Sequence, residues 1–210
     1  MLKIKICGIT NLKDALTAIK ESADTLGFIF YKKSPRYINP QKAKKIIEKL
    51  PSRINKVGVF VNEKERLVKK IVRNCKLNIL QFHGNESPSY CQRFRDYKVI
   101  KAFRIKNRNS LKDIPKYKVD YYLLDTYQKN KIGGTGETFD WELIKLVKKI
   151  KKPIILSGGL NPNNITKAIK KTKPNAIDLS SGVEKYPGKK DSGLLKKLFK
   201  KIKFFTKNDR

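Results

Sequence analysis

Two side chains at the ends of short apolar runs have the chemistry to move a proton. Cys7 ends the run LKIKIC, and Asp125 ends the run YYLLD. A thiolate accepts a proton, and a carboxyl group whose pKa is raised by an apolar setting donates one. The residues alone leave alternatives open: Cys7 is also explained as a small buried packing residue, and Asp125 as a cap or loop carboxylate.

Alternation along the first apolar run predicts where Cys7 points. In a strand, Leu2, Ile4 and Ile6 share one face, and Lys5 and Cys7 share the other. If the apolar face packs against helices, Cys7 points inward at the end of the strand, above Lys5. A neighbouring ammonium group stabilises a thiolate, so we expect Lys5 to lower the pKa of Cys7.

Two glycine- and serine-rich segments predict a phosphate site. LSGGL (156–160) and LSSGV (179–183) each follow an apolar run. Small residues let backbone N–H groups approach an anion closely, so we expect Gly158, Gly159, Ser180 and Ser181 to bind the phosphate of a small-molecule ligand. The alternative is two ordinary glycine turns.

Four further polar residues fall where they could complete such a site. Arg36, in YKKSPRYINP, suits bidentate binding of a planar carboxylate, unless it is an ordinary surface arginine. Gln81 and His83 share one face of the run LQFH and are candidates for the pocket wall, although His83 also suits a turn. Asp178 points inward between buried neighbours, so we expect it to pair with an interior lysine or to contact a ligand.

The elements that position these residues alternate regularly. Eight strand-then-helix units predict a single-domain (β/α)₈ TIM barrel over residues 1–210, with an open doubly wound sheet as the alternative. The strands are expected at 2–7, 25–30, 56–61, 78–82, 99–103, 121–125, 153–156 and 176–179. The helices are expected near 11–21, 40–49, 63–74, 87–94, 109–114, 140–150, 162–171 and 191–204. The glycine-rich segment KIGGTGETF (131–139) is expected to form a mobile lid.

Composition narrows the class of protein. A net charge of +32 would suit a nucleic-acid ligand, but the lysines are spread along the chain as pairs, so we expect a solvated lysine coat and no specific nucleic-acid binding. Three cysteines without a CxxC pair suit a reducing cytoplasm, and a single histidine makes a metal site improbable. No run approaches the ~20 apolar residues that a membrane span needs, so we expect no membrane association.

The motifs taken together resemble those of the phosphoribosylanthranilate isomerase family of tryptophan biosynthesis. They cover residues 3 to about 191 in the family's order: KICGIT, GFIF with SPRY, VGVF, LQFHG, LLDT, GGTGETFDW, LSGGL, DLSSGVE and PGKKD. The resemblance implies an Amadori rearrangement of N-(5-phosphoribosyl)anthranilate to 1-(2-carboxyphenylamino)-1-deoxyribulose 5-phosphate, with no metal or organic cofactor.

The same resemblance implies a role for each candidate residue. Asp125 would be the general acid that opens the ribose ring, and Cys7 the general base that removes the C2′ proton. Arg36 would bind the anthranilate carboxylate, and the glycine- and serine-rich segments would bind the phosphate. His83 and Asp178 would line the site.

Two other classes of function compete with this one: another sugar-phosphate barrel enzyme, and a nucleic-acid-binding protein. The related ribonucleotide isomerase of histidine biosynthesis has an aspartate where this chain has Cys7, and indole-glycerol-phosphate synthase uses lysine and glutamate catalysts that do not occur here at strand ends. A basic nucleic-acid-binding protein on a barrel scaffold would instead show salt-dependent binding and no turnover.

Overall fold

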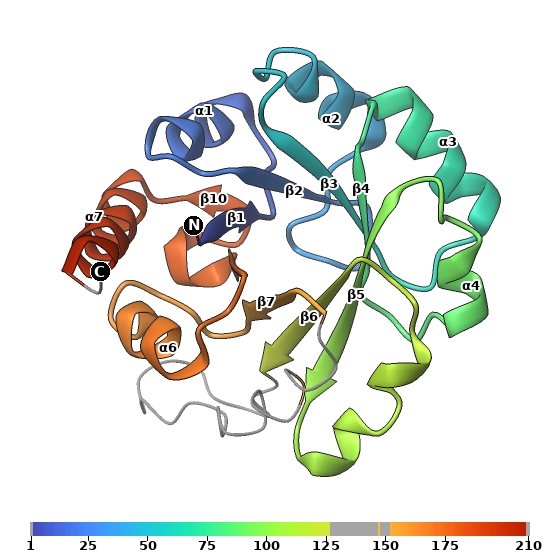
Figure 1. Cartoon of the computed structure of the whole chain (residues 1–210). Coiled ribbons are helices and arrows are strands. Elements are labelled where there is room, and N and C mark those ends of the chain that lie inside the picture. Colours follow the sequence, from blue (N-terminus) through green and yellow to red (C-terminus); the bar gives the residue numbers. More distant parts are fainter. Residues whose placement is uncertain (1, 127–146, 148–151, 209–210) are drawn as a thin grey trace.

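Eight parallel strands close into a barrel in sequence order, with β8 pairing back onto β1 (Figure 1). The computed structural model describes residues 2–126, 147 and 152–208. The strands are β1 (Lys3–Cys7), β2 (Thr25–Ile29), β3 (Asn55–Phe60), β4 (Ile79–Phe82), β5 (Lys98–Ile105), β6 (Tyr121–Thr126), β7 (Ile154–Ser157) and β8 (Ala176–Leu179). The predicted (β/α)₈ barrel is confirmed, and the open sheet is excluded.

Helices surround the barrel, as Figure 1 shows, and a small hairpin follows β8. The α-helices are α1 (Leu12–Lys20), α2 (Pro40–Ile47), α3 (Glu65–Cys75), α4 (Pro88–Gln92), α6 (Ile165–Thr172) and α7 (Ser192–Asn208). The shorter elements are the 3₁₀ segments η1 (Arg108–Leu111), η2 (Ile114–Lys116) and η3 (Ser181–Val183), and the antiparallel strands β9 (Glu184–Tyr186) and β10 (Lys189–Lys190). The predicted lid at 131–139 lies outside the described residues, and so does the predicted helix near 140–150 except for Val147, which is helical and buried.

The helix expected near 109–114 is wrong, because two 3₁₀ segments take its place. The Asn107 side chain caps the start of η1 by accepting hydrogen bonds from the backbone N–H groups of Asn109 and Ser110. Pro115 lacks a backbone N–H and disfavours helical geometry in the residue before it. The β5–β6 connection is therefore compact and irregular.

Alternation along the strands separates two apolar layers. Ile4 and Ile6 pack in the large cluster between the strands and the helices, whereas Cys7 belongs to the smaller cluster inside the barrel. That inner cluster is built from Cys7, Val57, Val59, Ile79, Ile100, Ala102, Leu123 and Ile155. The inward direction predicted for Cys7 is confirmed. In physical terms, the apolar face of β1 is removed from water by the helices, which leaves Lys5 and Cys7 facing the interior.

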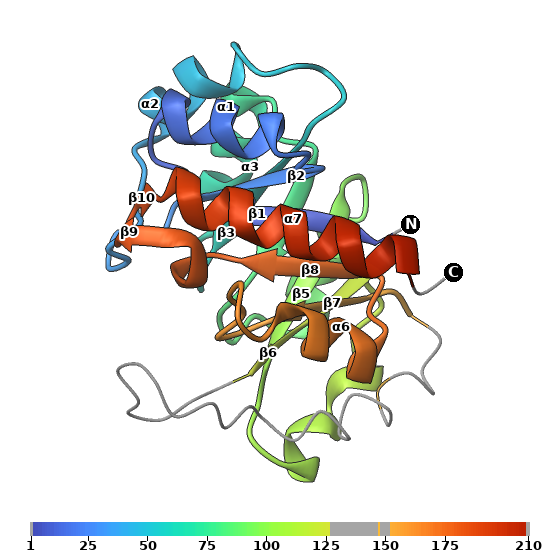
Figure 2. The ribbon, with the colours of Figure 1, turned by 90° about the vertical axis from the view of Figure 1, so that its left-hand side faces the viewer.

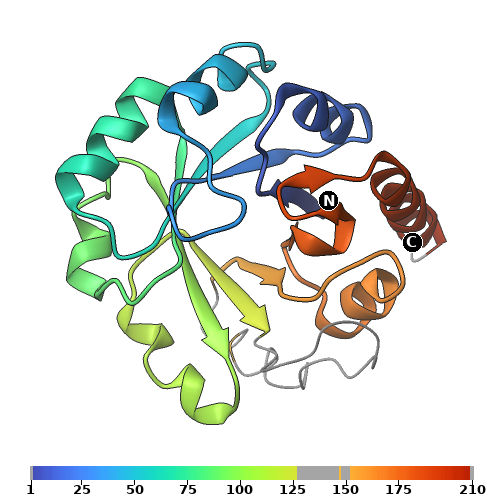
Figure 3. The same ribbon diagram turned by 180° about the vertical axis from the view of Figure 1, so that it is seen from behind.

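The two ends of the barrel differ. In Figure 2, the β9–β10 hairpin lies at the end toward which β8 points, and β1 begins at the opposite end. Figure 3 shows the segment between β2 and α2, drawn in light blue, crossing the barrel end. Asn11 and Asn39 cap α1 and α2 by accepting hydrogen bonds from backbone N–H groups, so each strand-to-helix segment is fixed at this end. In barrels of this kind, functional residues gather at the carboxyl ends of the strands.

Candidate active site

A cavity of about 300 Å³ opens at the carboxyl ends of the strands. Every residue that the sequence singled out lines it: Cys7, Arg36, Gln81, His83, Asp125, Gly158, Gly159, Asp178, Ser180 and Ser181. Further wall residues are Ile29, Val59, Ser157, Leu160 and Leu179. The two candidate proton-transfer groups, Cys7 on β1 and Asp125 on β6, therefore share one cavity although they come from strands that are not neighbours.

Cys7 lies beside a buried ion pair. Lys5 Nζ is 2.8 Å from Asp178 Oδ2, and each side chain is only 4% exposed. Burial is the largest single influence and lowers the pKa of Lys5, but Asp178 and Cys7 together raise it by more, so the net shift is upward and the ammonium is retained. The prediction that Asp178 pairs with an interior lysine is confirmed. Asp178 Oδ1 has no hydrogen-bond partner in the described part of the chain, and this carboxylate borders the cavity.

Lys5 lowers the pKa of the Cys7 thiol, as expected, but the net shift of that pKa is upward. Burial raises the pKa of Cys7, and the Asp178 carboxylate raises it further, while the Lys5 and Lys190 ammonium groups lower it. The net shift is upward because burial, the largest of these influences, outweighs the two ammonium groups. Sequence reasoning missed this outcome because the burial of Cys7, which is 5% exposed, is a property of the closed barrel.

A chain of hydrogen bonds leads to Asp125. Gln81 Nε2 is 2.8 Å from His83 Nδ1, and His83 Nε2 is 3.1 Å from Asp125 Oδ2. When the Gln81 amide donates to Nδ1, the imidazole proton sits on Nε2 and is donated to Asp125. His83 is thus a cavity residue bound on both sides, which the sequence left open, and its two partners come from β4 and β6.

The two small-residue segments lie against each other. Gly158 and Gly159 have left-handed φ angles of +90° and +63°, which favour glycine. A Cβ atom at Gly182 would lie 1.9 Å from the carbonyl oxygen of Leu160, so only glycine permits this approach. The Ser180 hydroxyl donates to the carbonyl oxygen of Cys7 at 3.2 Å. Both predicted anion-binding turns therefore line the same side of the cavity as the thiol.

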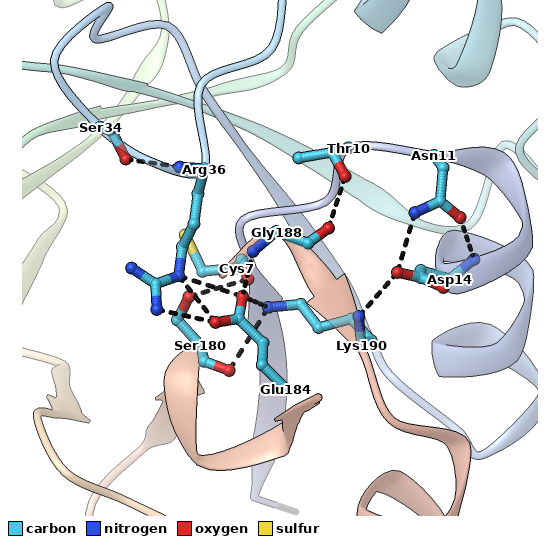
Figure 4. Close-up of polar contacts among 10 residues, drawn as sticks. All are labelled: Cys7, Thr10, Asn11, Asp14, Ser34, Arg36, Ser180, Glu184, Gly188 and Lys190. Atoms are coloured by element: carbon cyan, nitrogen blue, oxygen red, sulfur yellow. Dashed lines mark hydrogen bonds and ion pairs between the residues drawn. The ribbon is translucent and has the colours of Figure 1, made fainter. Parts of the chain in front are cut away.

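Arg36 already holds a carboxylate of the protein itself. Its Nε lies 3.0 and 2.9 Å from the two carboxylate oxygens of Glu184, and its Nη2 lies 2.7 Å from Oε2. The same Glu184 accepts a hydrogen bond from Lys190 Nζ at 2.8 Å (Figure 4). Burial raises the pKa of Glu184, but these two cations lower it more, so the carboxyl is ionised.

Glu184 and Lys190 were not predicted as site residues. The signal was present in the sequence, since Glu184 ends the motif DLSSGVE and Lys190 lies in PGKKD, but nothing in those motifs points to Arg36. In the structure, 148 residues separate Arg36 from Glu184 along the chain. Only the closure of the barrel brings them together.

Two other features of the described residues bear on the kind of protein. Within 2–126, 147 and 152–208, no three side chains of histidine, cysteine, aspartate or glutamate gather where they could hold a metal ion. In the same part of the chain, no helix has the length and apolar character to cross a bilayer.

A closed parallel barrel with titratable side chains and glycine turns around a cavity at its carboxyl end is the arrangement of a (β/α)₈-barrel enzyme. Comparison with known proteins gives the particular family. The family described as N-(5'phosphoribosyl)anthranilate (PRA) isomerase matches residues 4–201. This chain belongs to that family, and the resemblance and the enzyme class predicted from the sequence are confirmed.

Relatives of known name and structure agree. The N-(5'-phosphoribosyl)anthranilate isomerase of Geobacter sp. (strain M21) is 49% identical over 191 residues, which are 91% of this chain and 93% of that protein. The isomerase of Trichlorobacter lovleyi is 44% identical over 97% of this chain and 98% of its own length. The crystal structure of the Thermotoga maritima isomerase, 42% identical, matches 97% of this chain and all of that one with a TM-score of 0.91.

One matching structure contains a ligand. A phosphoribosyl anthranilate isomerase that is 40% identical was solved in complex with reduced 1-(o-carboxyphenylamino)-1-deoxyribulose 5-phosphate. It matches 97% of this chain and 100% of its own chain with a TM-score of 0.88. That ligand carries a phosphate and a carboxylate.

Proposed function

We propose that this chain converts N-(5′-phosphoribosyl)anthranilate into 1-(2-carboxyphenylamino)-1-deoxyribulose 5-phosphate by general acid–base catalysis. Membership of the isomerase family supports the reaction. The observation that carries the mechanism is the presence of Cys7 and Asp125 in one cavity, on strands β1 and β6. An aldose-to-ketose shift needs an acid and a base at different atoms of one bound sugar, and this pair can supply them.

In the first step, Asp125 acts as the general acid. Its carboxyl group donates a proton to the ribose ring oxygen, and the bond between that oxygen and C1′ breaks. The lone pair of the anthranilate nitrogen forms a double bond to C1′, which gives a protonated Schiff base. His83, 3.1 Å from Asp125 Oδ2, orients the carboxyl group for this transfer.

In the second step, Cys7 acts as the general base. Its thiolate removes the proton from C2′, and the electron pair of that C–H bond forms the C1′–C2′ double bond. The Schiff-base nitrogen receives the displaced π electrons, so it serves as the electron sink. The resulting enolamine becomes the ketone when its C2′ hydroxyl loses a proton and C1′ gains one. The reaction as proposed uses no metal or organic cofactor.

The two anionic groups of the substrate match two parts of the cavity. Backbone N–H groups of the turns at Gly158, Gly159, Ser180 and Ser181 would bind the phosphate. The Arg36 guanidinium would bind the anthranilate carboxylate. Gln81 and Asp178 complete the wall, and the partnerless Asp178 Oδ1 suits a sugar hydroxyl donor.

The setting and partners follow from the same proposal. We place the enzyme in the cytoplasm, because Cys7, Cys75 and Cys91 are all free and buried. Its partner is a phosphorylated small molecule. Specific nucleic-acid binding is not expected, since the positive charge is spread over the chain as lysine pairs.

Turnover by the purified protein tests this function. Loss of the fluorescence of N-(5′-phosphoribosyl)anthranilate is followed after the protein is added, with heat-denatured protein as the control. We expect first-order loss that depends on protein concentration. No turnover of this substrate would contradict the proposed function.

A further inference from the structure

Three side chains beside the cavity form one ionic cluster, which consists of Arg36, Glu184 and Lys190. Figure 4 shows the Glu184 carboxylate between the guanidinium of Arg36 and the ammonium of Lys190. The Glu184 and Lys190 side chains are 3% and 1% exposed, whereas Arg36 is 21% exposed and borders the cavity. We propose that Glu184 and Lys190 are positioning residues that fix Arg36 so that its outer edge recognises the carboxylate of the substrate.

The hydrogen bonds divide the Arg36 guanidinium into two edges. Nε and Nη2 face Glu184, at 2.7 to 3.0 Å. Nη1 has no protein partner among the described residues, and Nη2 carries a second N–H group. A guanidinium offers five N–H donors in a rigid fork, so the Nη1–Nη2 edge remains for a second, planar carboxylate. Glu184 thereby decides which edge of Arg36 is offered to the ligand.

The charges of the cluster favour an anion in the cavity. Two cations surround one carboxylate, so the cluster carries one uncompensated positive charge at the cavity wall. Burial lowers the pKa of Lys190, and Glu184 opposes that shift. Without Glu184, Arg36 and Lys190 would repel each other, and Arg36 would lose the contact that fixes it. Ordering a long side chain before the ligand arrives removes an entropic cost from binding.

Lys190 also connects this cluster to the phosphate side of the cavity. Its Nζ lies 3.4 Å from the carbonyl oxygen of Ser180, and the Ser180 hydroxyl donates a hydrogen bond to the backbone carbonyl oxygen of Cys7. One segment, residues 180–190, thus holds the turn proposed for the phosphate and the carboxylate that orients Arg36. The two anionic ends of the substrate are recognised from a common frame.

The frame is held by contacts besides those of Glu184, whose Oε1 also accepts a hydrogen bond from the Gly188 backbone N–H at 3.3 Å. Asp14 on α1 accepts hydrogen bonds from the backbone N–H of Lys190, at 2.7 Å, and from Lys189 Nζ. The Thr10 hydroxyl donates to the carbonyl oxygen of Gly188 (Figure 4). Glu184→Gln keeps an oxygen that can accept the Gly188 hydrogen bond, and the Asp14 and Thr10 contacts remain. The hairpin therefore stays attached to the barrel, and a change in the binding ratio reports on Arg36.

Binding of two ligands to Glu184→Gln tests the inference directly. One ligand is reduced 1-(o-carboxyphenylamino)-1-deoxyribulose 5-phosphate, and the other is the same molecule without the carboxylate. Calorimetry gives the ratio of their dissociation constants. We expect Glu184→Gln to reduce the wild-type preference for the carboxylated ligand by about tenfold to a hundredfold, because a hydrogen bond to a charged group contributes at that level. An unchanged ratio would overturn the inference.

A double variant shows whether Glu184 acts through Arg36. In Arg36→Met, the preference for the carboxylated ligand should be lost, and adding Glu184→Gln should cause no further loss. Additive losses, or a full preference in Arg36→Met, would contradict the inference. Should Glu184→Gln fail to fold, Glu184→Asp gives the same comparison with the charge retained: a reduced preference supports the inference and a wild-type preference contradicts it.

The controls separate this inference from the proposed function on which its substrate rests. Glu65→Gln removes an exposed carboxylate that pairs with Lys69 and Arg93 outside the cavity, and it should leave the binding ratio unchanged. Kinetics give the second readout: Glu184→Gln should raise KM and leave kcat within a few-fold of wild type. Binding is measured without turnover, so absence of activity in the wild type would count against the proposed function alone.

Discussion

His83 Nε2 lies 3.1 Å from Asp125 Oδ2, across the gap between β4 and β6. The other ring nitrogen of His83 is 2.8 Å from the amide nitrogen of Gln81, which is 1% exposed. The imidazole is thus fixed at both nitrogens, and its contact with Asp125 fixes the direction from which that carboxyl group reaches a ligand. The carboxyl group that we propose as the general acid is therefore oriented before any ligand binds.

Replacement of His83 tests this orientation. His83→Asn retains a polar side chain but is too short to reach both Gln81 and Asp125. We expect kcat to fall by about tenfold or more, with KM within a few-fold of wild type, because the acid is disoriented while the anion-binding residues remain. Steady-state kinetics provide the check, and a change confined to KM would contradict this role.

The reactivity of Cys7 should depend on pH in a defined direction. Its pKa is raised, chiefly by burial, so the thiolate needed as a base becomes more abundant as pH increases above neutral. We expect kcat/KM to rise over that range. Lys5→Met removes an ammonium and leaves the Asp178 carboxylate uncompensated, and both changes push the thiol pKa higher.

Titration of Cys7 by its rate of alkylation measures the effect. The Lys5→Met variant should react along a curve displaced to higher pH, with Cys91→Ser, outside the cavity, as the control. A Cys7 titration that Lys5→Met does not alter would show that the ion pair below the thiol has no electrostatic influence on it.

Arginine and lysine should not be interchangeable at position 36. A lysine ammonium lacks the planar fork, so it cannot pair with Glu184 and also bind a second carboxylate in bidentate fashion. We expect Arg36→Lys to raise KM by about tenfold to a hundredfold with a smaller effect on kcat. The comparison is made by saturation kinetics against wild type, and a wild-type KM would remove Arg36 from substrate recognition.

A second buried ion pair should stabilise the fold near His83. Lys101 Nζ is 2.9 Å from Glu86 Oε2, with both side chains almost fully buried, and Glu86 also accepts a hydrogen bond from the Gly84 backbone. Glu86→Gln leaves the ammonium without its counter-charge, so the free energy of unfolding should fall by about 3–5 kcal/mol. Glu65→Gln, at a surface pair, should cost much less, because exposed ion pairs contribute little to stability.

Urea denaturation of both variants gives these values. Combining Glu86→Gln with Lys101→Met should recover part of the loss, because no buried charge is then unpaired. Equal stabilities for Glu86→Gln and Glu65→Gln would show that the buried pair contributes no more than a surface contact.

Local sequence signals were sufficient for the barrel and for the inward face of β1. Alternation placed Cys7 and Lys5 inside, and the runs of apolar residues gave the strands to within a few residues. These local signals could not show how residues far apart in the sequence influence one another in the folded chain. The net charge around Cys7 depends on Asp178, and the orientation of Arg36 depends on Glu184, both contributed by the far end of the chain. Such partners become neighbours only when β8 closes onto β1.

The most direct test of the account is the kcat of Cys7→Ser and of Asp125→Asn at saturating N-(5′-phosphoribosyl)anthranilate. Each variant retains the size and the polar character of the original side chain but loses the proton-transfer group. We predict that each lowers kcat by a factor of about 10²–10⁴ while the folded structure is retained. A kcat near the wild-type value in either variant would contradict the assignment of that residue and with it the proposed acid–base mechanism.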